Sequence, residues 1–572
     1  MKILLLSSSY NSLTQKAHVE LQSLGHKVSV ELAINNDVMF EAVELFQPDL
    51  ILCPMLTHII PKRLWQKTPC IIIHPGIKGD RGAASLDWAI INKESQWGVT
   101  AVQAADEVDS GPIWASCQFT MRAGSKSSIY RDELSDAALH VIRTAVSRFE
   151  NGNYIPEPLD YSRSDVKGRY RAFIKQDQRK IDWEVDTVET ILTKIRSADS
   201  CPGLLDTING DEFYIYGAHR EGSLIGPPGK IIAQRHGAIC RAATDGAVWI
   251  THMKRKKDKS AGQFKLPATQ ILGMRSSDLP EAPIENLYAD SADTFKEIWF
   301  REENQVAYLY FEFYNGAMST DQCERLRQAY EEAASRPGIK VVVLMGGRDF
   351  WSNGIHLNVI EAAPNPADES WANINAMNDL VHSIITTTGK LVISAMHGNA
   401  GAGGVMLALA ADKILARQNV VLNPHYKGMG GLFGSEYWTY LLPKRIGPEL
   451  AELLTNSCLP ISADHAKNLQ LIDDVIYQDT GFPSTFHEQI SRIAEHLAVH
   501  PEYEIMLAKK SSRLNEDQKV KPLSQYRKEE LAQMRENFYG LDDSYHVARQ
   551  KFVLKEKPTE TPFHLAIHRD ET

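Results

Sequence analysis

Short apolar runs alternate with longer stretches of mixed polar and apolar residues over the first 160 positions. The apolar runs are rich in β-branched residues and have the length of strands, while the longer stretches have the length of helices. Four such strands are predicted, at residues 2–9, 26–33, 48–55 and 69–76. Because helices separate them, the pattern predicts a parallel sheet covered by helices. Ligands of such sheets bind beyond the carboxyl ends of the strands, so His74, in the last of these runs, is a candidate site residue.

The pattern changes between residues 161 and 280, where one helix precedes a series of short strands. Asp186 and Glu189 have the spacing of a capping box, and apolar residues at helical spacing follow until a Pro-Gly pair at 202–203. Four short strands separated by turns come next. This arrangement is typical of a small β-barrel-like domain.

A third region begins near residue 281 and returns to alternating strands and helices. An apolar strand at 306–313 precedes a helix that Ser319 and Gln322 begin as a second capping box. Residues 485–555 are helical in pattern and rich in charge. We therefore predict a multidomain α/β protein, with domains at 1–160, 161–280 and 281–572.

Composition limits the classes of function that are compatible with this chain. Apolar residues make up 43% and charged residues 23%, as in an ordinary soluble globular protein. The net charge of −10 argues against a general nucleic-acid binder, although a local basic pocket for a phosphorylated ligand stays open. The seven cysteines form no C-x-x-C pair, which argues against a disulfide framework and a thiolate zinc site, and no metal is expected.

Targeting and membrane-spanning segments are not expected. The N-terminus holds only four consecutive apolar residues, fewer than a signal peptide needs. The longest stretch of small apolar residues, near 401–411, is too short and too rich in glycine to span a membrane. A cytoplasmic location is therefore expected. The loop at 7–12 lacks the G-x-G-x-x-G pattern, which argues against a dinucleotide cofactor there.

Four motifs after the predicted strands stand in the order found in a known enzyme family. They are His74, Arg81-Gly82, Gly-Val-Thr at 98–100 and Asp109-x-Gly. This order resembles the formyltransferases that take the formyl group of 10-formyltetrahydrofolate. The resemblance extends over about residues 1–275, because the short strands after residue 200 are similar to the C-terminal β-domain of that family.

The resemblance implies that 10-formyltetrahydrofolate is the formyl donor and that His74 and Asp109 are catalytic, acting on a tetrahedral oxyanion and its proton. By position, the folate contacts fall on Met55, Leu56, Arg81 and Gly82. The family asparagine, a further oxyanion donor, is replaced by Ile72. Loss of one such donor typically costs about 100-fold in rate. Either the domain is degenerate or its acceptor is easier to formylate, and we favour a thiol acceptor.

Two glycine-rich turns lie in the third predicted domain, at 350–358 and 397–412. They resemble the crotonase, or enoyl-CoA hydratase, superfamily, in which two backbone N–H groups hold a thioester oxygen. By position, these N–H groups belong to Ile355 and Gly403. The resemblance also implies that Gly354 and Gly404 allow a coenzyme A thioester to come close to the backbone. One such turn alone needs no ligand, but two on consecutive β-α units favour a site.

The carboxylates of a hydratase are absent, because Met406 and His425 stand at their positions. Hydration needs those groups for acid–base work, so it is not expected. Tyr426 and Glu436 follow nearby and are the candidate catalytic phenol and carboxylate. The alternative is a core tyrosine and a surface glutamate without a catalytic role.

A formyl-donor site and a coenzyme A thioester site on one chain suggest formyl-CoA as the compound they share. The whole chain resembles a family of hydrogenase maturation factors, which implies conversion of 10-formyltetrahydrofolate, with coenzyme A, into carbon monoxide for nickel–iron hydrogenase. Arg131 and Arg549 are candidate contacts for the phosphates of coenzyme A. Besides the two small molecules, hydrogenase maturation proteins or the hydrogenase large subunit are candidate partners.

Two other functions remain open on the sequence. The first is a formyltransferase that acts on another acceptor, such as an amine, with the C-terminal half as a binding module. The second is a non-catalytic hydrogenase assembly factor, which would tolerate the loss of His74 and Glu436.

Overall fold

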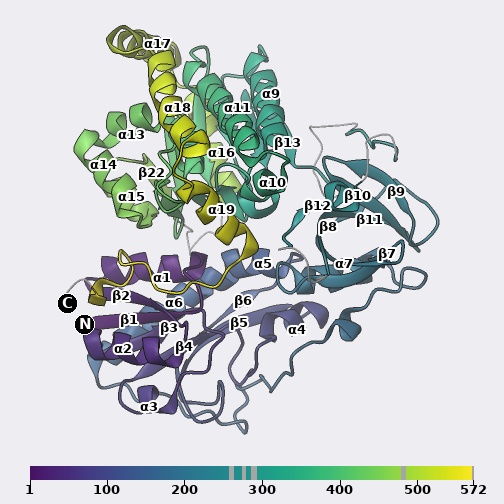
Figure 1. Ribbon diagram of the computed structural model, residues 1–572, viewed down its shortest axis with the longest axis vertical. Helices are drawn as coiled ribbons and strands as arrows, with labels where there is room; N and C mark the ends of the chain where they lie inside the picture. The colour runs from purple at the N-terminus through teal and green to yellow at the C-terminus, as the bar shows by residue number, and fades with distance from the viewer. Residues whose placement is uncertain (257–262, 274–278, 285–292, 478–484, 570–572) are drawn as a thin grey trace. The chain divides into compact units, whose positions relative to one another are not determined.

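The computed structural model describes residues 1–572 except 257–262, 274–278, 285–292, 478–484 and 570–572 (Figure 1). The chain forms two compact units. The first combines Met1–Ala282 with Lys557–Thr572, and the second is Pro283–Glu556. The predicted α/β multidomain class is confirmed, whereas the predicted division into three domains, with boundaries near 160 and 280, stays a prediction.

The first unit begins with a six-stranded sheet in the order β2-β1-β3-β4-β5-β6. Its strands are β1 (Lys2–Ser7), β2 (Lys27–Leu32), β3 (Leu50–Cys53), β4 (Cys70–His74), β5 (Gln96–Gln103) and β6 (Ile113–Thr120). The first four strands pair in parallel, as predicted, while β5 and β6 add an antiparallel edge. The carboxyl ends of β3 and β4 therefore meet at one rim of the sheet.

Helices cover both faces of this sheet, with α1 and α6 on one side and α2 on the other (Figure 1). The helices are α1 (Ser12–Ser23), α2 (Asn36–Phe46), α3 (Lys62–Trp65), α4 (Ser85–Ile91), α5 (Lys126–Ile129) and α6 (Ser135–Asn151), with a π-helical turn, η1 (Tyr130–Leu134), before α6. Strands covered on both faces are apolar throughout, which explains the unbroken apolar runs of β3 and β4.

A second, antiparallel sheet of the first unit has the order β7-β8-β11-β10-β9, with β12 beside β11. The strands are β7 (Leu204–Ile208), β8 (Asp211–Glu221), β9 (Ile231–Arg235), β10 (Ala238–Ala243), β11 (Gly246–Arg255) and β12 (Leu266–Pro267). Two short helices, η2 (Gln176–Arg179) and α8 (Ala268–Leu272), flank it. Its core is closed by α7 (Val188–Ala198), which buries Ile191, Leu192 and Ile195, as their helical spacing predicted.

The capping box predicted at the start of α7 is wrong. The N-cap is Thr187, whose hydroxyl accepts the N–H of Thr190 at 3.3 Å. Asp186 does not cap the helix, because its carboxylate accepts the N–H of Asp182 at 2.9 Å in the preceding turn. The prediction placed the N-cap one residue too early, because the side chains of Asp186 and Thr187 can both accept a backbone N–H.

The C-terminal segment Lys557–Thr572 packs on the first unit, along the edge strand β2. Val30 donates its backbone N–H to the carbonyl of Leu565 at 2.9 Å. Within this segment, η5 (Ile567–Arg569) holds a buried His568, whose Nε2 lies 3.0 Å from Oε2 of the buried Glu31. The segment thus covers an edge that would otherwise expose unpaired backbone groups.

The described residues of the second unit form two sheets, the larger with the order β13-β14-β15-β17-β19-β22. Its strands are β13 (Ile298–Glu303), β14 (Val306–Phe311), β15 (Val341–Leu344), β17 (Leu391–Met396), β19 (Lys413–Arg417) and β22 (Asp474–Ile476). The smaller sheet, β16-β18-β20-β21, consists of β16 (Phe350–Ser352), β18 (Asn399–Gly401), β20 (Val421–Asn423) and β21 (Ile461–Ser462). Only the edge pairs β13–β14 and β20–β21 are antiparallel among the described strands of this unit.

Helices surround both sheets of the second unit. They are η4 (Tyr314–Gly316), α9 (Thr320–Ser335), α10 (Leu357–Ala362), α11 (Pro366–Thr386), α12 (Gly403–Leu409), α13 (Trp438–Ile446), α14 (Pro448–Ser457), α15 (Ala463–Asn468), α16 (Phe486–Ala498), α17 (Tyr503–Val520), α18 (Leu523–Tyr539) and α19 (Ser544–Leu554). The capping box of Ser319 and Gln322 is confirmed at the start of α9. The helical pattern predicted for 485–555 is confirmed by α16 to α19.

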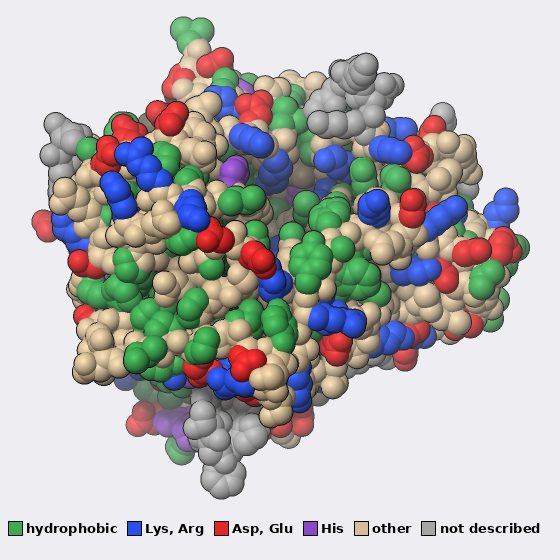
Figure 2. Space-filling model, turned by 90° about the horizontal axis from the view of Figure 1, so that it is seen from below, with side chains coloured by type: hydrophobic (Ala, Val, Ile, Leu, Met, Phe, Trp, Pro, Cys, Tyr) green, Lys and Arg blue, Asp and Glu red, His purple; other side chains and the backbone are tan. Residues whose placement is uncertain are grey.

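The face shown in Figure 2 carries basic and acidic side chains interspersed with apolar ones. Neither sign of charge dominates that face. Among the described helices, none combines the length and the apolar character that crossing a membrane requires.

Candidate functional site

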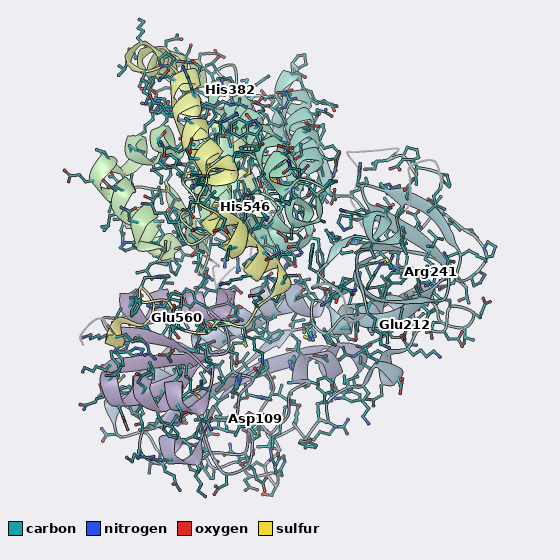
Figure 3. The ribbon with its side chains drawn as sticks, in the orientation of Figure 1. Asp109, Glu212, Arg241, His382, His546 and Glu560 are labelled. Carbon is teal, nitrogen blue, oxygen red and sulfur yellow. The ribbon has the colours of Figure 1, made fainter. Side chains whose placement is uncertain are left out.

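A cavity of about 630 Å³ opens in the first unit at the rim where β3 and β4 end. Met55 and Leu56, which follow β3, line it together with His74, Gly82 and Asp109. The structure therefore brings five of the predicted site residues to one cavity. Asp109 lies on the loop between β5 and β6 and is labelled in Figure 3.

Arg81 does not line this cavity, although the sequence predicted a folate contact for it. Its guanidinium pairs with Glu107 at 2.9 Å and donates to the carbonyl of Val108 at 2.9 Å. These contacts brace the loop that carries Asp109. Its predicted contact with folate stays a prediction.

His74 lies between two carboxylates, and sequence reasoning identified only one of them. Its Nδ1 is 3.4 Å from Oδ2 of Asp109, and its Nε2 is 3.0 Å from Oδ2 of Asp80. Asp80 is itself held by Arg171, whose Nε donates to Oδ1 at 2.7 Å. A carboxylate on each ring nitrogen fixes the orientation of the imidazole and gives it two routes for a proton. The sequence signal for Asp80 was its place in the loop after His74, directly before the Arg81-Gly82 motif.

The backbone of Asp109 and the position of Ile72 give two further details of this cavity. Asp109 has a left-handed backbone conformation, with φ of 56°, and its carboxylate accepts the N–H of Gly82 at 3.1 Å. Such strained residues persist only where surrounding contacts hold them. Ile72 also lines the cavity, so the position of the missing asparagine presents an apolar side chain to the ligand space.

The second candidate site lies in the second unit, where β16 and β18 each lead into a glycine turn. A side chain on Gly354 would lie 3.4 Å from the backbone nitrogen of Gly403, which begins α12. Within the described part of the chain, the N–H groups of Ile355 and Gly403 donate to no protein acceptor. Next to them, Ala402 has φ of 48° and ψ of −125°. Two neighbouring free N–H groups on a strained turn can hold a carbonyl oxygen.

Gly404 has a structural reason to be glycine. A side chain there would overlap the backbone carbonyl of Ser352 in β16. The close approach of α12 to β16 therefore requires this glycine. The contact with coenzyme A that the sequence suggested for Gly404 and Gly354 stays a prediction.

Tyr426 and Glu436 form a buried pair beside this turn. The tyrosine hydroxyl donates to Oε2 of Glu436 at 2.8 Å, and the two residues are 7% and 1% exposed. A side chain on Gly403 would overlap Oε1 of Glu436, so the carboxylate lies against the first residue of α12. The alternative of a surface glutamate is therefore wrong. The local sequence could not reveal this, because residues distant along the chain surround the glutamate, among them Gly403 of α12 and Asn378 of α11.

Burial raises the pKa of both side chains of this pair. Loss of solvation raises the pKa of Glu436 to about 8, against the hydrogen bond from Tyr426, which lowers it. Burial and the neighbouring Glu436 raise the pKa of Tyr426 well above its usual value. A carboxyl group that titrates near neutral pH is suited to general acid–base catalysis.

The two arginines predicted to bind phosphates are found in different units. Arg131 lies in η1, directly after Tyr130, which lines the cavity of the first unit. Arg549 in α19 is buried, and its guanidinium donates to Glu361 at 2.8 Å and contacts His546, labelled in Figure 3, at 2.8 Å. Its charge is therefore already paired within the second unit. In the described residues, no cluster of three or more His, Cys, Asp or Glu side chains has the arrangement of a metal site.

Three family descriptions match the chain: "Formyl transferase" at residues 14–146, "Formyl transferase, C-terminal domain" at 173–265 and "Enoyl-CoA hydratase/isomerase" at 301–560. The hydrogenase maturation factor HoxX of Bradyrhizobium diazoefficiens is 46% identical over 569 residues, which cover 100% of this chain and 97% of that protein. A methionyl-tRNA formyltransferase of Trichlorobacter lovleyi is 28% identical, over 41% of this chain and 72% of that protein.

A solved structure is similar over the same full length. HypX from Aquifex aeolicus, crystallised in complex with tetrahydrofolic acid, is 42% identical and superposes with a TM-score of 0.94. The alignment covers 100% of this chain and 99% of that one.

Proposed function

The chain belongs to the family of hydrogenase maturation factors called HoxX or HypX, and from this premise we propose that it makes carbon monoxide. The formyl group would come from 10-formyltetrahydrofolate and pass through formyl-CoA. The observation that carries this proposal is the buried Tyr426–Glu436 pair against the glycine turn, in a chain whose other unit holds His74 and Asp109 in a cavity. The relative crystallised with tetrahydrofolic acid supports folate as the donor.

In the first step, the formyl group moves from N10 of the folate to the thiol of coenzyme A. A C–S bond forms, the C–N bond breaks, and the thiol proton passes to the folate nitrogen. His74 would stabilise the tetrahedral oxyanion, and Asp109, 3.4 Å away, would orient the ring and help to move the proton. A thiol acceptor is compatible with Ile72, because a thiolate is a strong nucleophile that needs less stabilisation of the oxyanion.

In the second step, formyl-CoA gives carbon monoxide and coenzyme A. The formyl C–H bond and the C–S bond break, and the proton ends on the thiol sulfur. The N–H groups of Ile355 and Gly403 would polarise the carbonyl. Glu436 would accept the formyl proton, because a base with a pKa near the working pH combines availability with strength. Tyr426 would give its own hydroxyl proton to sulfur and take up the proton held by Glu436 in exchange.

The remaining assignments belong to the same proposal. Met55, Leu56, Arg81 and Gly82 would contact folate, while Gly354, Gly404, Arg131 and Arg549 would contact coenzyme A. Arg549 would do so while paired with Glu361. No metal takes part. The protein would act in the cytoplasm, with hydrogenase maturation proteins or the hydrogenase large subunit as partners.

The decisive experiment supplies the purified protein with 10-formyltetrahydrofolate and coenzyme A and follows carbon monoxide by the absorbance shift of a haem protein. Carbon monoxide should form only when both substrates are present. The Glu436→Gln variant should accumulate formyl-CoA without releasing carbon monoxide. Unchanged release by that variant would remove Glu436 from the mechanism.

One alternative has a specific observation in its favour. The His74–Asp109 cavity lies entirely within the first unit, so formyl transfer to an amine would need nothing from the second. Such an enzyme would consume the folate without coenzyme A and release no carbon monoxide. A non-catalytic assembly factor is favoured only by Ile72, and it would keep its function after His74→Ala and Glu436→Ala.

A further inference from the structure

We propose that Glu530, on α18, is a positioning residue. It holds Glu436 in its reactive geometry and places a negative charge near the Glu436 carboxyl group. This inference rests on the proposed role of Glu436 in carbon monoxide release. It concerns a residue 94 positions further along the chain, in a helix that follows both glycine-rich turns.

Glu530 is fully buried, and both of its oxygens are occupied by one short segment. Oε2 accepts the N–H of Tyr437 at 2.9 Å and the hydroxyl of Ser435 at 3.2 Å. Oε1 accepts the N–H of Thr439 at 2.9 Å and its hydroxyl at 2.6 Å. All four donors lie in residues 435–439, which surround Glu436. A carboxylate can accept all four bonds, whereas an amide would place a donor against another donor.

The segment needs such support, because its backbone is strained. Glu436 and Tyr437 have φ of 59° and 60°, a left-handed conformation that side-chain-bearing residues rarely adopt. Tyr437 is also the N-cap of α13, and its own side chain supplies no capping bond. Glu530 therefore satisfies N–H groups at the start of α13 from another helix, where a local Ser, Thr or Asp would ordinarily do so.

A second buried side chain supports the same segment from the opposite helix. Asn378 of α11 accepts the N–H of Glu436 at 2.7 Å with its Oδ1 and donates to the hydroxyl of Ser435 at 2.9 Å with its Nδ2. Ser435 thus links Asn378 to Glu530. The strained residue is held between two helices that are distant in the sequence, and this is the arrangement that positions a catalytic side chain.

Glu530 differs from Asn378 in carrying a charge close to Glu436. Burial raises the pKa of Glu530 to about 7. Its negative charge adds to burial in raising the pKa of Glu436. Glu436 therefore holds its proton more tightly when Glu530 is ionised than when it is neutral.

The other groups around Glu436 do not replace this effect. The titratable side chains that face it are Tyr426 after β20, Glu530 of α18 and Cys323 of α9. The neighbouring Tyr437 is faced by Arg527 of α18 and Asp379 of α11, which form an ion pair of 2.6 Å with each other. Their opposite charges largely cancel, which leaves Glu530 as the negative charge that acts on Glu436.

The test measures the pH dependence of carbon monoxide release from supplied formyl-CoA by the full chain. Glu530→Gln should lower the rate and move the apparent pKa of release to lower pH by about one unit, because a like charge is lost. Glu530→Asp keeps the charge but shortens the side chain, so it should lower kcat about 10-fold while the apparent pKa stays in place. Glu536→Gln removes an exposed charge from the same helix and should behave as the wild type.

A Glu530→Gln profile that superposes on the wild type overturns the charge effect and with it the proposal. If that variant does not fold, Glu530→Asp decides, since full kcat would show that the position of this carboxylate is irrelevant. The failure of the proposed function has a different signature. In that case Glu436→Gln itself releases carbon monoxide from formyl-CoA at the wild-type rate.

Discussion

The hydroxyl of Tyr426 donates to Oε2 of Glu436 over 2.8 Å, in an interior where the glutamate is 1% exposed. Burial raises the pKa of this carboxyl to about 8, and the hydrogen bond opposes that rise because it stabilises the charged form. The acidity of Glu436 is therefore a balance between contacts that can be removed one at a time. Removal of the Tyr426 hydroxyl should raise the pKa of Glu436, whereas removal of the Glu530 charge should lower it.

Tyr426→Phe removes the hydrogen bond and keeps the ring. The pKa of Glu436 should then rise further, so the pH of half-maximal carbon monoxide release should move to the alkaline side. At about pH 7 the rate should fall about 10-fold or more. The measurement is the pH–rate profile with formyl-CoA, and Tyr477→Phe, at an exposed tyrosine, is the control. A shift of the profile to lower pH would contradict the assigned hydrogen bond.

Glu436→Gln should stabilise the second unit at alkaline pH. The folded pKa of about 8 lies above the ordinary glutamate value of 4.5, so the folded state binds the proton more tightly than the unfolded state does. The stability linked to this proton is fully present below about pH 4.5 and is lost as the pH rises through about 8. Relative to the wild type, the variant should gain a few degrees in Tm at about pH 8 and little at about pH 5.

This pH-dependent difference can be followed by calorimetry at the two pH values. Glu452→Gln changes an exposed carboxyl of the same unit and should leave the difference in Tm unchanged. An equal gain at both pH values would mean that Glu436 is not a proton-binding site with a raised pKa.

His74→Ala should separate the two halves of the reaction. Formyl transfer from 10-formyltetrahydrofolate to coenzyme A should fall by about 10²- to 10⁴-fold, the usual contribution of a positioned acid–base group. Carbon monoxide release from supplied formyl-CoA should remain at the wild-type rate, because the Tyr426–Glu436 pair lies in the other unit. Both rates are measured on one protein preparation, and loss of both would contradict the assignment of one step to each unit.

Gly76→Ala should reproduce much of the loss seen in His74→Ala without removing a functional group. A side chain at this position would lie 2.5 Å from Oδ2 of Asp80 and 2.6 Å from Nε2 of His74, so it must displace that contact. Formyl transfer should fall at least about 10-fold. Gly338→Ala places the same methyl group in open space and should be neutral. Normal transfer by a folded Gly76→Ala protein would show that the His74–Asp80 contact is dispensable.

Local pattern was sufficient for much of the fold. The strands that end near Cys53 and His74 and the glycine turns before Ile355 and Gly403 could all be read from runs of apolar residues and from glycines. The start of α7 was misplaced by one residue, because Asp186 and Thr187 can both accept a backbone N–H and only the surrounding turn selects one.

The order of the elements, the two glycine turns and the residue types of the candidate sites could be predicted from local pattern, because these features depend on neighbours along the chain. Other features exist only in the folded protein. Asp80 contacts His74, Glu530 and Asn378 hold the segment around Glu436, and the carbonyl of Leu565 accepts an N–H of β2. Burial and electrostatic coupling arise from residues brought together across long stretches of chain, so they leave no local sequence pattern.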